Sequence, residues 1–317
     1  MTGQTVWITG ARGFIGQALV RARSEAGDRV HGLGHGDARL PPGTGLSGWT
    51  GGDVDRRTLD AALTQSGSPA VIYHLAGGAS VRVAEIDPEG DHRRTVEASA
   101  ALLDWAAGNA PEAALVIISS AAVYGEAAPG RIPETAPLKP ISAYGRNKAK
   151  VEDLARAHAA KYGGRVAIAR LFSVYGPGLR KQLLWDISRR LADGPEALSL
   201  SGSGDELRDW TAVDDVCAAL PQLAAAASPE APVVNVGHGV GVPVHDIASM
   251  MLAGWSSPAR LTFSGERPPG DPFSLVADPE RLAALGFRCR ISAPEGVAAY
   301  AGWSRDVLKS GSAGMPQ

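Results

Sequence analysis

The sequence predicts an α/β fold with a doubly wound parallel sheet, on two observations. First, compact apolar runs alternate with helix-length segments through the first half of the 317-residue chain. Second, these runs are continuously apolar instead of alternating, which is typical of strands buried on both faces of a parallel sheet. Right-handed crossovers between such strands place helices on both faces of the sheet.

Each element is assigned from its own pattern, in chain order. Short runs rich in apolar and β-branched residues predict strands at residues 5–9, 29–33, 70–75, 115–119 and 166–171. Segments at residues 14–26, 91–107 and 143–160 have the length and patterning of the helices between those strands. A further apolar run at 232–236 predicts one more strand.

The pattern changes after about Phe172, where glycine and proline become frequent and the helical patterns become shorter. Strands are expected to be sparser there. We therefore expect a large first domain over residues 1–172, to which segments near 209–236 return. Residues 173–308 are expected to form a smaller domain over the carboxyl edge of the sheet, followed by a flexible tail at 309–317.

Composition excludes several classes of protein. Apolar residues make up 44% of the chain and charged residues 20%, with a net charge of −2, so no global basic field exists to hold nucleic acid or an anionic membrane. Two cysteines exclude a disulfide framework or a cysteine zinc site, and no His/Asp/Glu cluster has metal-ligand spacing. No apolar run approaches a membrane span and the start lacks a signal-peptide pattern, so we expect a soluble, cytoplasmic protein.

A glycine-rich loop follows the first predicted strand and opens a helix. Gly10, Gly13 and Gly16 are spaced Gly-x-x-Gly-x-x-Gly. Glycine at such positions allows a tight turn, the approach of a pyrophosphate and close helix–strand packing. The free N–H groups at the helix start favour phosphate, so the loop predicts a dinucleotide site. The alternative is a simple turn.

Tyr144 and Lys148 lie four residues apart in a predicted helix, so their side chains share one face. A nearby cation favours the phenolate, so Tyr144 would exchange protons with a hydroxyl or carbonyl near neutral pH. The alternative is an exposed helix turn. Ser119 and Ser120 follow a buried strand, where a hydroxyl either meets a substrate or caps the strand end.

Together these motifs resemble the short-chain dehydrogenase/reductase superfamily, specifically its extended branch of nucleotide-sugar epimerases, dehydratases and reductases. The resemblance continues, in the same order, through residues 52–54, 74–77, 170–178, 208–216 and 267–271. It implies a Rossmann-type sheet, with the dinucleotide on residues 1–172 and a nucleotide-diphosphate sugar held mainly by residues 173–308. It also implies a homodimer formed through the helices at 91–107 and 143–160.

The resemblance implies which residues contact the cofactor. Asp53 would face the adenine amino group and Lys148 would hold the nicotinamide ribose. The full set is Gly10, Arg12, Gly13, Phe14, Ile15, Gly16, His35, Asp53, Val54, Leu75, Ala76, Gly77, Tyr144 and Lys148. His74, beside this set, is expected to be structural.

The type of dinucleotide is argued from charge. An acid at the end of the second strand would hydrogen-bond a ribose 2′-OH and repel a 2′-phosphate. Gly34 stands at that place, while Arg12 lies in the glycine loop, where some NADP-using relatives have a basic residue. A cation without a nearby carboxylate favours NADP(H). NAD(H) is the alternative if Arg12 is merely solvated.

The same resemblance implies that Ser120, Tyr144 and Lys148 form the catalytic group, with Ser120 hydrogen-bonded to the reacting oxygen. Dehydratases of the branch carry acids just after this serine, where this chain has Ala121 and Ala122. Expelling a hydroxyl needs an acid, so dehydration is not expected. Thr95 stands where many relatives have an asparagine near the nicotinamide, which puts that contact in doubt.

On the substrate side, Ser173 replaces an asparagine that commonly contacts the sugar nucleotide. Arg208 and Arg267 lie in family motifs, and guanidinium groups bind phosphate oxygens in pairs. Lys181 would add charge. The alternative for each arginine is an exposed salt bridge. Asp214 and Asp215 are expected to fix a loop and cap a helix.

These observations favour an NADPH-dependent reductase of a 4-keto nucleotide sugar, with Tyr144 as proton donor and Ser120 polarising the carbonyl. The close alternative is a nucleotide-sugar 4-epimerase, similar to UDP-glucose 4-epimerase, that keeps NAD bound. A dinucleotide-binding regulator without activity is a third hypothesis. It is disfavoured because Ser120, Tyr144 and Lys148 are all present.

Overall fold

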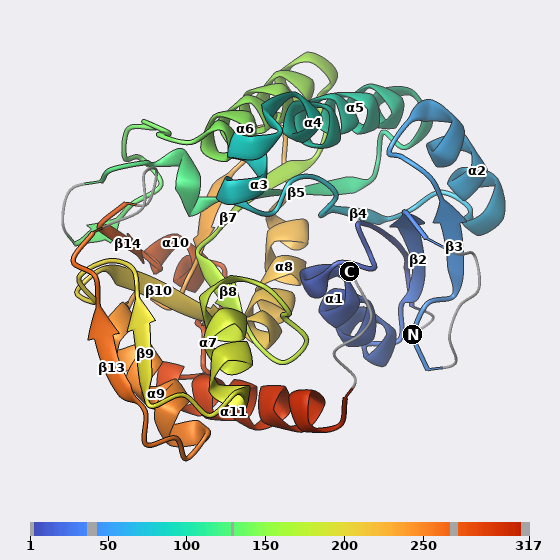
Figure 1. The fold of residues 1–317 in the computed structure, drawn as a ribbon. Helices are drawn as coiled ribbons and strands as arrows, with labels where there is room; N and C mark the ends of the chain where they lie inside the picture. The colour runs from blue at the N-terminus through green and yellow to red at the C-terminus, as the bar shows by residue number, and fades with distance from the viewer. Residues whose placement is uncertain (1–2, 37–42, 128–129, 267–271, 312–317) are drawn as a thin grey trace.

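The computed structural model describes residues 3–36, 43–127, 130–266 and 272–311. Seven parallel strands form the central sheet, in the order β11-β7-β5-β4-β1-β2-β3 (Figure 1). Their bounds are β1 Thr5–Thr9, β2 Arg29–Gly34, β3 Gly48–Gly51, β4 Val71–His74, β5 Ala114–Ser120, β7 Val166–Leu171 and β11 Val233–Val236. The doubly wound parallel sheet predicted from the sequence is confirmed. The strand order reverses between β1 and β4, where such sheets open a ligand crevice.

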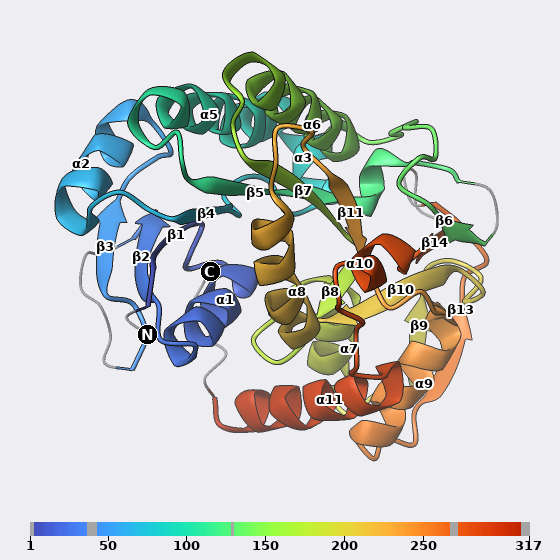
Figure 2. The same ribbon diagram turned by 180° about the vertical axis from the view of Figure 1, so that it is seen from behind.

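Helices cover both faces of the central sheet (Figure 2). One face carries α1 (Phe14–Glu25) and α8 (Val213–Ala226), which share a hydrophobic cluster with alternate residues of the strands. The other face carries α2 (Arg56–Ser66), α5 (Ala98–Asn109) and α6 (Ala143–Tyr162), with a second cluster. Strands buried on both faces explain the continuously apolar runs of the sequence.

Helix α6 begins and ends at recognisable signals, and this fixes Tyr144 in its first turn. The side chain of Ser142, the N-cap, accepts a hydrogen bond from the Gly145 amide. The helix ends at Gly163, whose φ of 66° is left-handed and favours glycine. Helix α6 ends two residues after its predicted end at residue 160, because the helical pattern of apolar residues stops before the terminating glycine.

The helix predicted at 91–107 is a longer, composite run. It consists of α4 (Pro88–His92), the π-helical segment η1 (Arg93–Glu97) and α5. Thr95, within η1, accepts a hydrogen bond from the Gly78 amide at 2.7 Å. A π-helical turn inside an α-helix is common at functional sites, and periodicity in the sequence does not reveal it.

The structure holds more short strands than predicted, most of them after Phe172. A second sheet has the order β12-β10-β14-β6, with β8 also paired to β10, and β9 pairs with β13. The bounds are β6 Arg131–Ile132, β8 Ser173–Tyr175, β9 Ala197–Leu200, β10 Leu207–Ala212, β12 Gly241–Pro243, β13 Arg260–Phe263 and β14 Ser274–Ala277. The expectation of sparse strands was wrong, because strands of two to six residues are too short to show a pattern.

Three helices of the second half pack together beneath these strands (Figure 1). They are α7 (Gln182–Ala192), α9 (Val244–Gly254) and α11 (Ala293–Lys309), and they enclose a hydrophobic cluster of their own. The remaining short helices are α3 (Val81–Ile86), η2 (Ala121–Val123) and α10 (Glu280–Ala284). In the described ranges no helix has the length and apolar character needed to cross a lipid bilayer.

Candidate active site

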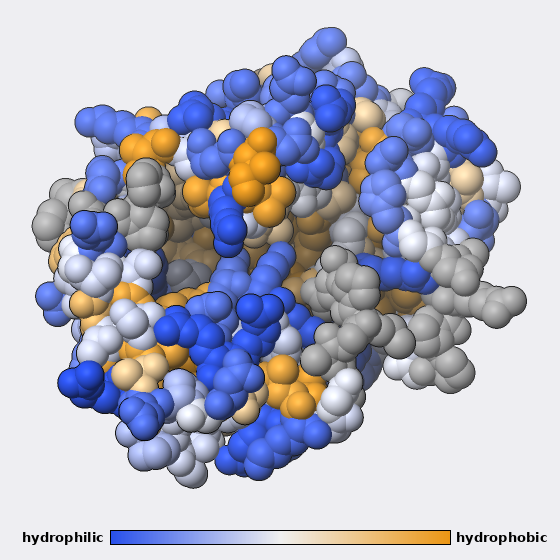
Figure 3. Space-filling model, viewed as in Figure 1, coloured by the Kyte–Doolittle hydropathy of each residue, from blue (hydrophilic) through white to orange (hydrophobic). Residues whose placement is uncertain are grey.

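A cavity of about 2490 Å³ opens at the carboxyl ends of β1, β2, β4, β5 and β7. Its opposite wall comes from α7, β9 and β10, and Figure 3 shows the hollow at the centre of the face. Typical ligand pockets occupy roughly 300–1,000 Å³, so this cavity has room for a dinucleotide and a second ligand of similar size. It is lined by all the predicted site residues that the structure describes. Arg267 lies outside the described residues.

The glycine loop forms a close-packed cradle between β1 and α1. Gly10 has a φ of 66°, a conformation that favours glycine. A Cβ atom on Gly16 would lie 2.2 Å from the Gly10 carbonyl oxygen, so α1 approaches the loop backbone closely only with glycine at that position. Helix α1 begins after Gly13 without a side-chain cap, so its first amides are left to a ligand in the cavity. This geometry fits a dinucleotide pyrophosphate.

Replacing Gly16 with alanine is expected to destabilise the fold by about 1–3 kcal/mol, because the added methyl group meets backbone atoms that cannot turn away. Dinucleotide binding should weaken as well, since the same contact shapes the phosphate cradle. Gly108→Ala on α5 is the control: nothing lies within 4 Å of the added methyl group. The control should be neutral or stabilising by up to about 1 kcal/mol. Urea unfolding measures both, and equal effects would contradict the packing argument.

At the far end of the cavity, the carboxylate of Asp53 lies beside the end of β2. Asp53 Oδ1 lies 3.0 Å from Nε2 of His35, and both side chains are exposed. His35 is two residues after Leu33 of β2. The guanidinium of Arg12 lies 4.3 Å from the centre of the Trp49 ring. The charge argument for NADP(H) assumed a cation with no carboxylate nearby. The structure weakens that argument, because the loop after β3 brings Asp53 to the β2 edge beside His35.

Ser120, Tyr144 and Lys148 all line the cavity at the end of β5, where the family resemblance implied a common group. The side chains of Ser120 and Tyr144 both line the cavity and lie close enough for the Ser120 hydroxyl to lower the pKa of the phenol. Lys148 Nζ lies 5.8 Å from the centre of the Tyr144 ring and donates a hydrogen bond to the Ile118 carbonyl at 3.0 Å. Ser120 Oγ accepts a hydrogen bond from the Ala122 amide at 3.2 Å, so Ser120 caps η2 beside the phenol.

The protonation of this group departs from the sequence expectation. Burial raises the pKa of Tyr144, and the negative charge of Asp91 adds to that effect, while the Ser120 hydrogen bond opposes it. Burial also lowers the pKa of Lys148 to about 8. The protein side chains alone therefore do not favour a phenolate at neutral pH. An additional positive charge in the cavity is needed, and oxidised nicotinamide would supply one.

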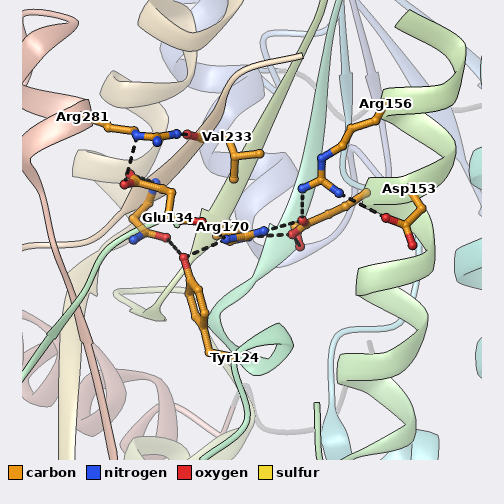
Figure 4. Close-up of polar contacts among 10 residues, drawn as sticks. Tyr124, Glu134, Asp153, Arg156, Arg170, Val233 and Arg281 are labelled. Carbon is orange, nitrogen blue, oxygen red and sulfur yellow. Dashed lines mark hydrogen bonds and ion pairs between the residues drawn. The ribbon is translucent and has the colours of Figure 1, made fainter. Parts of the chain in front are cut away.

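A buried polar network supports the catalytic strand from behind (Figure 4). Arg170 on β7 donates two hydrogen bonds to the Glu152 carboxylate, at 2.8 and 2.6 Å, and the Ser119 hydroxyl donates to the same carboxylate at 2.6 Å. Arg170 also donates to the Tyr124 hydroxyl at 2.9 Å, which in turn donates to Asn235. The network ties α6 and β5 together one residue away from Ser120.

Sequence reasoning missed Glu152, Asp91 and Asn147. Glu152 follows Lys148 by four residues on α6, so helical spacing alone would have put it on the face of the catalytic pair. Asn147 donates a hydrogen bond to Asp91 at 2.7 Å, and no spacing rule links residues on two different helices. His74, expected to be structural, is fixed between Thr9 Oγ1 at 2.8 Å and Ser99 Oγ at 2.9 Å.

On the opposite wall, the structure places the remaining predicted residues along the cavity. Ser173 lies on β8, Lys181 is the N-cap of α7, and Arg208 lies on β10. Burial lowers the pKa of Lys181. Arg208 is 9% exposed and donates hydrogen bonds to the Leu207 and Phe273 carbonyls, so its backbone contacts hold it at the wall.

Residues 6–237 match the model of the NAD dependent epimerase/dehydratase family, which spans well over half of the chain. The chain belongs to this family. The resemblance drawn from the glycine loop and the Tyr-x-x-x-Lys pair is thereby confirmed, and the protein is an enzyme of the nucleotide-sugar epimerase/dehydratase type.

Similar members of the family align over almost the whole chain. The UDP-glucose 4-epimerase of Azospirillum brasilense is 29% identical, and the alignment covers 100% of this chain and 98% of the relative. The solved structure of MoeE5 in complex with UDP-glucuronic acid and NAD is 32% identical, with a TM-score of 0.84 over 95% of this chain and 99% of that one. The UDP-glucose 4-epimerase of Thermus thermophilus, solved in complex with NAD, is 26% identical, with a TM-score of 0.85 over 95% and 99%.

Proposed function

We propose that this protein is an NAD-dependent 4-epimerase of a UDP-sugar. The observation that carries the proposal is the convergence of Ser120, Tyr144 and Lys148 on one wall of a cavity that is large enough for two nucleotide ligands. Ala121 and Ala122 line the same cavity where a dehydratase would need an acid. Similar proteins are named as UDP-glucose and UDP-glucuronate 4-epimerases, which supports UDP as the nucleotide.

The side chains have distinct roles in this proposal. Tyr144 would act as the phenolate, which takes the proton from the sugar 4-hydroxyl to become the phenol and later returns that proton to the carbonyl oxygen. Ser120 holds that oxygen and the phenol in line by hydrogen bonding. The Lys148 ammonium, fixed by the Ile118 carbonyl, stabilises negative charge on the phenol oxygen and binds the nicotinamide ribose. NAD, when bound, supplies the reversible hydride transfer.

We assign the UDP-sugar to the wall formed by residues 173–308. Lys181 and Arg208 bring positive charge to that wall, which suits a diphosphate. Ser173 at the start of β8 would contact the sugar. Arg267 stays a proposal from the sequence motif alone. A homodimer formed through α6 and the run of helices from α4 to α5 stays a prediction, and size-exclusion chromatography would test it.

An NADPH-dependent 4-keto-sugar reductase is the second candidate, because one observation favours it. Arg12 lies at the cavity wall against Trp49, close to the end of β2, where a 2′-phosphate would sit. Two observations favour NAD instead: Asp53 lies at the same edge, and structures of similar proteins hold NAD. The same Ser120, Tyr144 and Lys148 serve either reaction, so the cofactor decides between them.

The test separates these reactions directly. We expect purified protein supplied with NAD to interconvert the 4-epimers of UDP-glucose or UDP-glucuronate with no net change in absorbance at 340 nm. Proton NMR of the sugar follows the reaction. Stoichiometric consumption of NADPH with a 4-keto nucleotide sugar, and no epimer formation with NAD, would favour the reductase. Binding of dinucleotide without either reaction would contradict both.

A further inference from the structure

A buried carboxylate lies directly behind the active-site wall. Asp91 on α4 has 1% of its surface exposed. Its Oδ2 accepts a hydrogen bond from Asn147 Nδ2 at 2.7 Å, and Asn147 precedes Lys148 on α6. Its Oδ1 has no hydrogen-bond partner within the part of the chain that the structure describes. A buried carboxylate with an unused oxygen is unfavourable unless a nearby charge balances it.

The unused oxygen faces the loop that follows β4. A Cβ atom on Gly78 would lie 1.8 Å from Asp91 Oδ1, so the Gly78 backbone rests on the carboxylate. Gly78 lines the cavity whereas Asp91 does not. Asp91 is therefore one layer behind the wall and can affect the reaction only through a neighbour.

That neighbour is Lys148, whose own surroundings leave it few sources of negative charge. Two buried carboxylates lie beside Lys148: Asp91 is hydrogen-bonded to the residue that precedes Lys148, and Glu152 follows Lys148 by four residues on α6. Both raise the pKa of the Lys148 ammonium. Glu152 already pairs with Arg170 at 2.6 Å and with Arg156 at 2.8 Å. Asp91 takes part in no ion pair among the described residues, so its charge is the one left to balance Lys148.

Two further titratable groups beside the pair are neutral at neutral pH. His74 on β4 faces Lys148, and burial lowers its pKa to about 3, so it is neutral. Tyr144 on α6 keeps its proton, because burial raises its pKa. On the far side, His92 Nδ1 lies 3.4 Å from Asn147 Oδ1 and does not contact the carboxylate by a hydrogen bond.

We propose that Asp91 is a positioning residue whose buried carboxylate keeps the Lys148 ammonium charged behind the cavity wall, with Asn147 fixing the orientation of the carboxylate. This inference extends the proposed function. It depends on that function in one respect, which is that Lys148 takes part in the reaction. The charge state of Lys148 can be measured without any turnover. A carboxylate that acts only as packing would not influence that charge state.

Asp91→Asn provides the test, because it removes the charge and keeps the shape and an oxygen that can accept from Asn147. The chain has six lysines, so ¹³Cε-labelled lysine gives a simple spectrum in which Lys148→Arg identifies the signal. The wild-type signal should titrate with a pKa of about 8. In Asp91→Asn the midpoint should move to lower pH, because the ammonium loses its nearby negative charge.

The pH dependence of turnover gives an independent measure of how the Asp91 charge acts on Lys148 and Tyr144. Asp91 raises the pKa of both Tyr144 and Lys148, so its removal should move both limbs of the pH–rate profile toward acid. The ratio of variant to wild-type kcat should fall about fivefold or more between pH 6 and pH 9. Asp104→Asn, an exposed acid on α5, is the matched control and should leave the Lys148 titration and the profile unchanged.

Two outcomes would overturn the inference. One is a folded Asp91→Asn protein whose Lys148 midpoint equals that of the wild type. If the variant does not fold, the wild-type protein decides: the ¹³Cγ signal of Asp91 should respond to the Lys148 titration near pH 8, and a flat response overturns the inference. Absence of epimerase activity in the wild type would refute the proposed function and leave these NMR readouts in place.

Discussion

Replacing Tyr144 with phenylalanine is expected to lower kcat about a thousandfold and to leave NAD binding nearly unchanged. The loss follows from removing the only atom that exchanges protons with the sugar in the proposed reaction, and general acid–base catalysis contributes roughly 10²–10⁴-fold. The phenyl ring keeps the packing beside Lys148, whose hydrogen bond to the Ile118 carbonyl does not involve the phenol. Turnover with a UDP-sugar and fluorescence titration with NAD measure the two quantities.

Tyr162→Phe is the matched control, because Tyr162 ends the same helix and is 48% exposed. It should keep full activity. Both variants should unfold at nearly the wild-type temperature, since neither hydroxyl supports the core. Full turnover by Tyr144→Phe would remove the assigned proton carrier and with it the proposed mechanism, whichever cofactor is used.

The sequence predicted the parts of the site whose residues lie close together in the chain, within one loop or one helix. Gly10, Gly13 and Gly16 lie in one loop, and Tyr144 and Lys148 lie one helical turn apart, so each group is fixed by a single element. The glycine loop and the Tyr144–Lys148 pair lie on the same cavity because the carboxyl ends of the parallel strands lie at one edge of the sheet. The family resemblance implied the placement of Ser120 against Tyr144, and the shared edge of the sheet gives its physical reason.

The rest depends on contacts between distant elements. Asp53 reaches His35 from the loop after β3, and that strand (Gly48–Gly51) was not predicted because its glycines and threonine give no apolar run. Asp91 meets Asn147 from a composite helix with a π-helical segment, which no periodicity reveals. The raised pKa of Tyr144 comes first from burial, a property of the folded surroundings and not of the motif.

Arg170→Met is expected to lower the free energy of unfolding by about 3–5 kcal/mol, which is a large part of the stability of a typical domain. Arg170 is 2% exposed and Glu152 is fully buried, so the substitution leaves a buried carboxylate without its main partner. The Tyr124 hydroxyl and the Glu134 carbonyl each lose a donor as well. Urea unfolding at neutral pH measures the loss.

The companion variant Arg156→Met separates burial from charge, because Arg156 pairs with the same Glu152 oxygen at 2.8 Å from a side chain that is 37% exposed. Solvent screens that pair, so its loss should be no more than about 1 kcal/mol. Equal losses in the two variants would contradict the argument that burial makes Arg170 dominant.

The pH dependence of the Arg170→Met deficit gives a further check on its cause. Burial alone would raise the pKa of Glu152, and the hydrogen bonds and charge of Arg170 hold it below its ordinary value. Without Arg170 the folded-state pKa should rise above the unfolded value. The deficit should then be full at neutral pH and shrink as the pH falls through that raised pKa, because the folded protein binds the proton more tightly than the unfolded chain. A deficit that stays constant down to about pH 4 would mean that lost packing, and not the loss of Arg170 as the buried partner of the Glu152 carboxylate, destabilises the variant.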